Sequence, residues 1–162
     1  MAVDMFLKID GVKGESKDQA HTQEIDVFSW SWGMSNSGSA HQGGGAGSGK
    51  VNVQDLSVTK YLDSSSAPLM LSCCNGTHFD SALLTVRKAG GEKPVEYVTI
   101  KLQEVLITSV TTGASGADDR LTENVSLNFA KVKVEYLPQE AKGGKGNMIP
   151  FSWDIAANDD EV

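Results

Sequence analysis

The sequence predicts a mostly β protein: an antiparallel β-barrel, or two packed sheets, with one short α-helix. About seven or eight segments alternate in polarity with a period of two, which is the pattern of a half-buried strand. Only one stretch has the features of a helix, and strands do not alternate with long helical segments, so a parallel α/β fold is excluded. The 162 residues fit a single domain over 1–162.

The first two strands are predicted near the N-terminus. Apolar side chains occupy every odd position of residues 3–9, so they share one face of a strand. Farther along, Phe28, Trp30 and Trp32 share one parity and have polar neighbours. Three large aromatic side chains on one face bury much apolar surface, so we expect this segment to be a core strand.

Two further strands are predicted in the middle of the chain. Leu56, Val58 and Leu62 share one parity and predict an inward face. Leu84 and Val86 predict the next strand, which a pair of glycines follows. Because glycine adopts backbone conformations that other residues avoid, this pair predicts a turn into a long partner strand.

The longest strands are predicted over 97–110 and 123–137. In the first, the apolar residues share one parity, with Glu104 and Thr108 as exceptions. Its inward set comprises Val98, Ile100, Leu102, Leu106 and Val110. In the second, the apolar set changes parity halfway. A bulge near Ala130 would direct both halves toward one core.

The single helix is predicted between residues 64 and 76. Residues 64–66 are serines that offer N-cap oxygens, Pro68 suits a first turn, and a following Asn-Gly pair can end the helix. It contains the only two cysteines, Cys73 and Cys74. Adjacent cysteines cannot form a bridge of normal geometry, so we expect reduced, partly buried thiols. The last strand follows over 151–155.

The charge balance limits the possible partners. Fourteen Lys and Arg residues against 21 Asp and Glu give a formal net charge of −7, which repels a phosphate backbone, so nucleic acid is not expected. No apolar run approaches the ~18 residues that span a bilayer, and the N-terminus alternates in polarity, unlike a signal peptide. We expect synthesis in the cytoplasm, no stable membrane insertion and, for any export, a route without a cleaved leader.

Residues 44–50 have the spacing of a phosphate-binding loop, with Gly44, Gly49 and Lys50 at the diagnostic positions. However, Val51 stands where a Ser or Thr would bind magnesium, and the alternating valines predict a strand where a helix N-terminus would hold the phosphates. We therefore interpret this run as a flexible linker that ends in a solvated lysine.

No other cofactor site and no catalytic set is predicted. The three histidines lie far apart and have no Cys or carboxylate at metal-ligand spacing, so we interpret them as surface residues. They are His21, His41 and His78. The acidic pairs lack the spacing of a calcium loop. A folded chain can still gather such groups, so a monomeric small-ligand-binding or hydrolytic β-barrel stays open as an alternative.

Residues 35–49 form a predicted loop of unusual length, rich in Gly and Ser and without an apolar anchor. Loops of about 15 residues are uncommon inside a compact domain and usually bind something or are ordered by a partner. We expect assembly contacts in this loop. The residues expected to make them are Ser35, Asn36, Ser37, Gly38, His41, Gly44 and Gly49.

Short runs spread over nearly the whole chain match one known family in order. They include Val12-Lys13-Gly14-Glu15-Ser16, Trp30-Ser31-Trp32-Gly33-Met34, Val53-Gln54-Asp55-Leu56, Arg87-Lys88-Ala89-Gly90-Gly91 and Leu127-Asn128-Phe129-Ala130. Together they resemble the Hcp (haemolysin-coregulated protein) family of type VI secretion systems. Residues 141–162 match least, because only Trp153-Asp154-Ile155 is similar to the closing strand of that family.

The resemblance implies a phage tail-tube-like fold, six copies of which close into a ring, and rings that stack into a tube inside a contractile sheath. It implies a structural tube subunit and not an enzyme. The implied partners are the protein itself, the sheath and spike proteins of the type VI system, and small effector toxins carried in the lumen. The implied location is the bacterial cytoplasm, followed by secretion through this system.

The resemblance suggests roles for two of the predicted loops. The loop over 35–49 is expected to order against the next ring, so its deletion should leave hexamers intact and abolish tubes. The turn over 113–116 is expected at the lumen, because passing cargo favours short side chains. Its candidate contacts are Gly113, Ser115 and Gly116.

Overall fold

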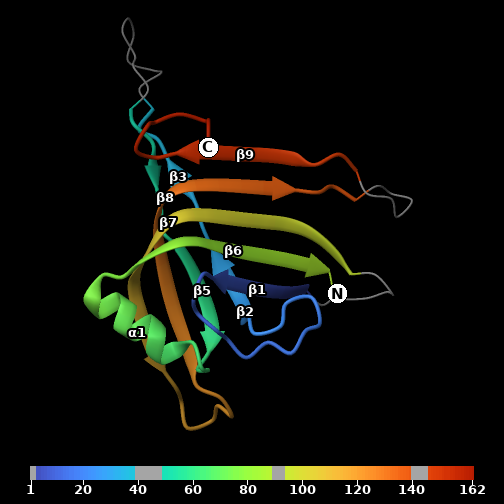
Figure 1. Cartoon of the computed structure of the whole chain (residues 1–162), viewed down its shortest axis with the longest axis vertical. Helices are drawn as coiled ribbons and strands as arrows, with labels where there is room; N and C mark the ends of the chain where they lie inside the picture. Colours follow the sequence, from blue (N-terminus) through green and yellow to red (C-terminus); the bar gives the residue numbers. More distant parts are fainter. Residues whose placement is uncertain (1–2, 39–48, 89–93, 140–145) are drawn as a thin grey trace, which may run out of the picture.

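A computed structural model describes residues 3–38, 49–88, 94–139 and 146–162, which form nine strands and one helix. Figure 1 shows two sets of strands that cross at a steep angle, with the helix beside them. In chain order the elements are β1 (Val3–Ile9), β2 (Ile25–Ser31), β3 (Met34–Ser35), β4 (Asn52–Val53), β5 (Leu56–Tyr61), α1 (Ser66–Asn75), β6 (His78–Lys88), β7 (Val95–Gly113), β8 (Thr122–Tyr136) and β9 (Ile149–Asp154).

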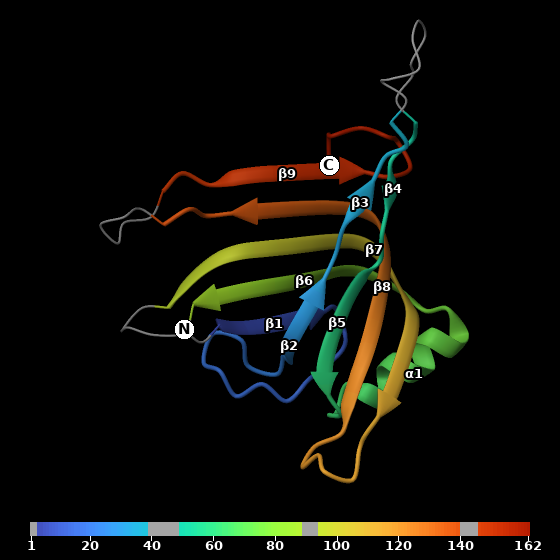
Figure 2. The same ribbon diagram turned by 180° about the vertical axis from the view of Figure 1, so that it is seen from behind.

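Six of these strands close into an antiparallel barrel. Their order is β5-β2-β1-β6-β7-β8, and β8 returns to β5 through pairs from Leu56↔Leu127 to Tyr61↔Thr122. The second half of β8, from Lys131, pairs instead with β9, which extends the sheet beyond the barrel (Figures 1 and 2). The predicted β-barrel with one short helix is confirmed.

Three neighbouring strands bend along one line across the sheet. The residues that face the core change from odd to even positions, or the reverse, at Asp80 in β6, Glu104 in β7 and Ala130 in β8. The pairing register between these strands is the same before and after these three residues. The change of parity near Ala130 is present, but the predicted bulge there is wrong, because β7 and β8 keep one register across this point and bend together. The predicted inward set of β7 is correct for four residues and wrong for Leu106, because Val105 and Ile107 take the inward positions there. The four are Val98, Ile100, Leu102 and Val110.

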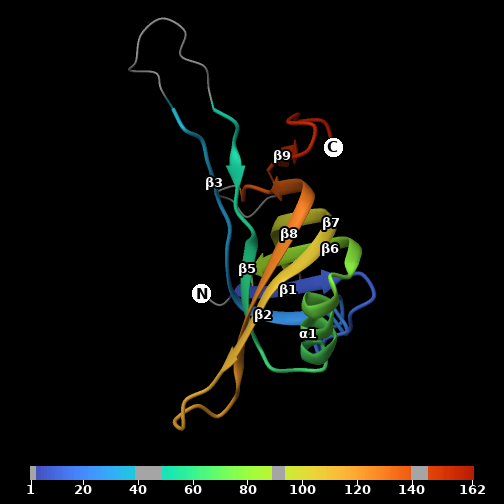
Figure 3. The same cartoon turned by 90° about the vertical axis from the view of Figure 1, so that its left-hand side faces the viewer.

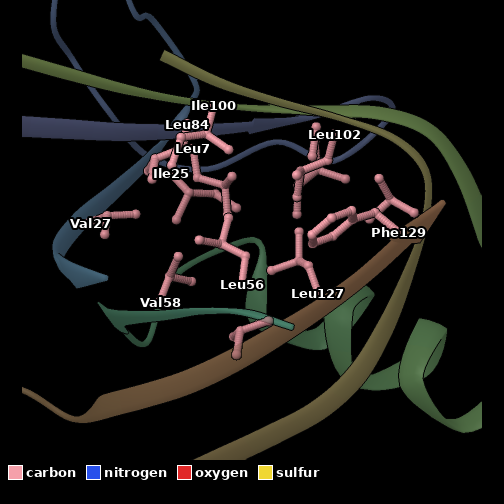
Figure 4. Close-up of a cluster of buried hydrophobic side chains, with 14 of the residues drawn as sticks. Leu7, Ile25, Val27, Leu56, Val58, Leu84, Ile100, Leu102, Leu127 and Phe129 are labelled. Carbon is pink, nitrogen blue, oxygen red and sulfur yellow. The ribbon is translucent and has the colours of Figure 1, made fainter. Parts of the chain in front are cut away.

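The core fills the space inside the barrel. Figure 4 shows aliphatic side chains from β1, β2, β5, β6, β7 and β8 that converge on its centre. Fully buried members include Leu7, Ile25, Leu56, Leu84, Ile100, Leu102 and Leu127. Burying each such side chain contributes roughly 1.5–3 kcal/mol. The packing of distant strands on one another therefore holds the barrel together.

The aromatic segment is not the core strand that its alternation predicted. β2 buries Ile25 and Val27, and the register then shifts before Ser29, which leaves Phe28 42% exposed. Trp30 and Trp32 are only partly buried, against the edge of the core. A bulge reverses the parity of the residues that follow it, so a prediction of strict alternation fails here.

β5 also differs from its prediction. Leu56 and Val58 are buried as expected, but Leu62 lies beyond the strand and is 40% exposed. The inward place is taken by Lys60, whose side chain is fully buried. Its ammonium group lies 2.6 Å from Oε2 of Glu123, which is also fully buried. A charged pair therefore occupies part of the interior.

The helix ends as predicted and begins differently. Gly76 follows α1 with φ of +69° and donates its N–H to the carbonyl of Ser72 (3.0 Å), so glycine closes the helix. The N-cap residue, Ser65, makes no side-chain capping bond. The N-cap is thus a serine, as predicted, but the expected capping hydrogen bond is absent. Both cysteines are free thiols; Cys73 is partly buried, but Cys74 is exposed, against expectation.

Candidate functional site: a candidate assembly surface

Four strand segments form a wall whose outward face is mostly polar, apart from the neighbouring aromatic rings of Phe28 and Tyr61. The wall consists of β2, β5, the first half of β8 and the second half of β7, which lie side by side in Figures 2 and 3. Alternate residues of these segments face the core, so their neighbours face outward. Most outward residues have small hydroxyl or amide side chains, namely Ser29, Ser31, Ser57, Thr59, Ser109, Thr111, Asn124 and Ser126.

Hydrogen bonds between strands organise this face. Thr59 Oγ1 donates to Oδ1 of Asn124 (2.8 Å), and the hydroxyls of Ser57 and Ser126 lie 3.4 Å apart. At one end, Asp55 accepts bonds from Thr108 Oγ1 (2.7 Å) and Asn128 Nδ2 (2.9 Å). Away from Phe28 and Tyr61, the wall therefore presents short, partly paired polar groups.

Both sides of the wall end in a free strand edge. β7 pairs with β6 only as far as Leu106, so beyond this residue it pairs, among the described residues, with β8 alone. β2 pairs with β1 only up to Val27, and from Ser29 to Ser31 its one described neighbour is β5. Such an edge exposes backbone N–H and C=O groups that can pair with another chain.

The predicted stacking loop belongs to an arm that extends from one end of the molecule. Its described residues are 34–38 and 49–53. Ser35 lies in β3 and pairs with Asn52 of β4, and the N–H of Gly49 donates to the carbonyl of Ser37 (3.4 Å). Figure 3 shows this arm continuing the line of the wall. Asn36, Ser37 and Gly38 are exposed. His41 and Gly44 lie outside the described residues.

The predicted lumen residues lie on the hairpin between β7 and β8, at the opposite end of the wall from the arm (Figure 3). Gly113 ends β7 opposite Thr122. Ser115 donates from its hydroxyl (3.0 Å) and from its backbone N–H (3.1 Å) to Oδ2 of Asp118. A Cβ atom placed on Gly113 or Gly116 would contact nothing within 4 Å. The hairpin therefore has an open surface.

The two histidines that the structure describes do not gather into one site. His78 is exposed at the start of β6, but the interpretation of His21 as a surface residue was wrong, because it is 7% exposed. Its ring nitrogens contact Oε2 of Glu24 (2.5 Å) and Oε1 of Glu96 (2.7 Å), and its ring stacks on Phe6. Within the described ranges, no group of three or more His, Cys, Asp or Glu residues could hold a metal ion.

An ion cluster beside His21 has no counterpart among the sequence predictions. The buried guanidinium of Arg87 donates to Oδ2 of Asp18 (2.5 Å) and to Asp4 (3.2 Å). The hydrogen bond from Arg87 lowers the pKa of Asp18 to about 2, while the same contact raises the pKa of Arg87. This cluster ties the loop between β1 and β2 to β6.

The free edges were also missed, although the sequence contains a signal for each. Phe28 and Thr108 both break the apolar alternation, and each marks a register shift at the start of a free edge. A break in alternation can equally mark a bulge inside a fully paired strand. Only the strand order separates these two cases.

Comparison with protein families decides the assignment. A family model described as "Type VI secretion system effector, Hcp" matches residues 6–136. This chain belongs to the Hcp family. In the part of the chain that the structure describes, we find no helix long and apolar enough to cross a membrane.

Individual Hcp relatives agree over nearly the full length. Protein hcp1 of Pseudomonas aeruginosa is 65% identical over 159 residues, which cover 98% of each chain. The crystal structure of Hcp1 from Salmonella typhimurium is 35% identical with a TM-score of 0.79, and covers 99% of this chain and 100% of its own. A type VI secretion system effector from Yersinia pestis is 32% identical with a TM-score of 0.76, over 93% of this chain and 99% of its own.

Membership of the Hcp family defines the class of protein. The chain is a secreted protein of a type VI secretion system, with a structural role and not an enzymatic one. The resemblance of the short sequence runs is thereby confirmed. The surfaces described above are therefore interpreted as surfaces for assembly.

Proposed function

We propose that this chain is the structural subunit of the type VI inner tube, in which hexameric rings stack and carry small effector toxins in their lumen. The whole chain, 1–162, acts as one domain in this proposal. Its further partners are the sheath and spike proteins of the same system. The protein is made in the cytoplasm and leaves through the secretion system without a cleaved leader.

The observation that supports ring formation is the pair of free edges on opposite sides of the wall. A head-to-tail contact joins two different surfaces of identical copies, and it closes a ring when the rotation between copies divides the circle. Pairing the free part of β7 in one copy with the free part of β2 in the next joins the four-stranded walls into one continuous sheet. The number of copies in the ring, six, is taken from the resemblance to the Hcp family.

The polar outward face supports a transport lumen. If the walls join, their hydroxyl and amide side chains line the channel. Short uncharged polar groups can exchange hydrogen bonds with water and cargo without the strong attraction of an apolar or charged surface. Cargo of varied sequence can then pass, and the hairpin with Ser115 lies at the rim of this surface.

Mass measurement tests the proposal. Size-exclusion chromatography with light scattering should give about six times the monomer mass of 17.2 kDa, and negative-stain images should show rings. A monomeric small-ligand-binding barrel would give 17.2 kDa. Lone molecules at every concentration, without annular particles, would overturn the proposal.

An edge variant tests how the ring closes. Ser109→Lys with Thr111→Lys places charges on the free edge of β7, and charged edges resist strand pairing, so rings should dissociate. The control is Asn124→Lys, which adds a charge to the same outward face on a strand that has neighbours on both sides. If the control loses the ring equally, the edge is not the contact.

The cargo site is tested at the hairpin. Ser115→Trp fills the open surface there, so a small effector toxin co-expressed with the variant should be recovered with it in smaller amounts. Ala157→Trp, at an exposed turn after β9, is the control. Unchanged recovery with the Ser115 variant would remove the hairpin from the cargo surface.

A further inference from the structure

The outward face of α1 is apolar and has no charge. None of the ten residues of the helix is ionised, and its inward face uses Ser66, Leu69 and Ser72. Leu71 is 63% exposed and Met70 is 37% exposed. Ala67, Pro68 and Cys74 are the other apolar residues exposed to solvent. A surface helix normally places charged residues on its outer face, so this face is built for burial.

A matching surface lies on the other side of the molecule. A groove there is lined by Ala20, Pro94, Leu137 and Met148, beside two charged groups. Both groups already have partners within the molecule, because Arg87 binds Asp18 and Asp4 while Glu96 contacts His21. What remains open to a partner is mainly apolar, and Met148 is 51% exposed.

The positions of the two surfaces suit a ring. α1 packs against β7, the strand with one of the free edges, so the helix face continues that edge. The groove lies where β7 begins, β8 ends and β9 begins, which Figures 1 and 2 place on the side away from α1. A head-to-tail contact requires two different surfaces on opposite sides of one molecule.

We infer that α1 of one copy packs into this groove of the next copy, with Leu71 between Leu137 and Met148. The inference rests on the proposed ring and names a second lateral contact, separate from the strand edges. Copies with a net charge of −7 repel one another, so contact is favoured where unpaired charge is absent. Apolar area of this kind is typical of permanent contacts between identical subunits.

Two single charge substitutions, one on the helix and one in the groove, test the contact. Leu71→Asp and Met148→Asp each place a carboxylate in the proposed interface without touching the barrel core. Each should raise the protein concentration at half assembly by about tenfold or more. The control is Val162→Asp at the C-terminus, where an equally apolar side chain is 50% exposed. Assembly of either variant at the wild-type concentration would overturn the contact.

The native thiol provides a second measurement that needs no charge substitution. In a Cys73→Ser background, Cys74 reports on the exposed helix face. N-ethylmaleimide should label it about tenfold or more slowly in rings than in dissociated chains. Equal rates would show that the face is open in the ring, which would overturn this inference alone. If wild-type protein forms no ring, the proposed function itself fails.

Discussion

The buried pair of Lys60 and Glu123 joins four elements at one point. Besides Glu123, the Lys60 ammonium contacts Ser66 Oγ (3.1 Å) at the start of α1 and Asp63 Oδ1 (3.0 Å) before it. Thr112 of β7 donates to the second oxygen of Glu123 (3.1 Å). All three ammonium hydrogens therefore have acceptors, which offsets part of the desolvation cost of a buried ion pair.

Breaking this pair on one side should be costly. Lys60→Met leaves a buried carboxylate without its partner and should lower the free energy of unfolding by about 3–5 kcal/mol. The double variant Lys60→Met, Glu123→Leu should recover much of that loss. Urea denaturation at one protein concentration measures both. Lys133→Met removes an exposed pair with Glu135 and should cost less than about 1 kcal/mol; an equal cost in both single variants would contradict this account.

The contact between Asp18 and Arg87 makes stability depend on pH. Arg87 lowers the pKa of Asp18 from 3.8 to about 2 in the folded chain. The contact therefore stabilises the fold above pH 3.8 and loses its effect as the pH falls through 2. The difference in urea midpoint between wild type and Asp18→Asn should shrink from pH 6 toward pH 2. A difference that stays constant would show that Asp18 acts through packing only.

At the level of elements, the shared bend of β6, β7 and β8 lets one long strand belong to two differently oriented parts of the sheet. Before the bend β7 lies between β6 and β8, and after it β7 forms one side of the polar wall. Glu104 sits at the bend with φ of 55°, a conformation that costs a non-glycine residue roughly 1–2 kcal/mol. The bend therefore depends on an unusual backbone conformation in the middle of a strand.

Glycine at this position should relieve that cost. Glu104→Gly should leave the melting temperature unchanged or raise it, because the gain in the folded state offsets the extra chain entropy of glycine. Gln103→Gly, one residue earlier in extended backbone, should lower stability by about 0.5–1 kcal/mol. Thermal unfolding followed by circular dichroism compares the two. A larger loss for Glu104→Gly than for its neighbour would show that the glutamate side chain stabilises the bend.

For the whole molecule, the arm and the hairpin with Ser115 mark opposite ends of the wall (Figure 3). If rings stack as proposed, one end of each subunit meets the other end of the next, so the base of the arm lies on the side of a neighbouring ring. The arm is separate from both lateral surfaces, which are the strand edges and the helix face. Stacking and ring closure should therefore respond to different substitutions.

Shortening the arm tests this separation. Removing residues 39–48 joins Gly38 directly to Gly49, whose N–H already donates to the carbonyl of Ser37, so the base of the arm can be kept. The variant should form rings of wild-type mass and no tubes in electron micrographs. Replacing the same ten residues by a Gly-Ser run of equal length separates the effect of length from that of sequence. Tubes of normal length in the deletion variant would exclude the arm from stacking.

Local patterns in the sequence predicted much of this fold. The alternation of residues 3–9, the change of parity at Ala130 and the glycine after α1 each depend on neighbouring residues, and the structure contains all three. The family was also predictable, because several different runs, Trp30-Ser31-Trp32 among them, follow one another in the order typical of the family. Each of these signals can be read without knowing which strand lies beside which.

The tertiary structure decided what depends on strand order. Phe28 is exposed although Trp30 and Trp32, of the same parity, pack against the core, because a bulge lies between them. Lys60 can occupy an inward position because it pairs with a carboxylate 63 residues away, which no local pattern predicts. The free edges of β2 and β7 exist because their partners end early, which no pattern within either strand encodes. The sequence by itself determined the strands, the helix and the family. Barrel closure decided which surfaces remain for assembly, because pairing joins residues far apart in the chain.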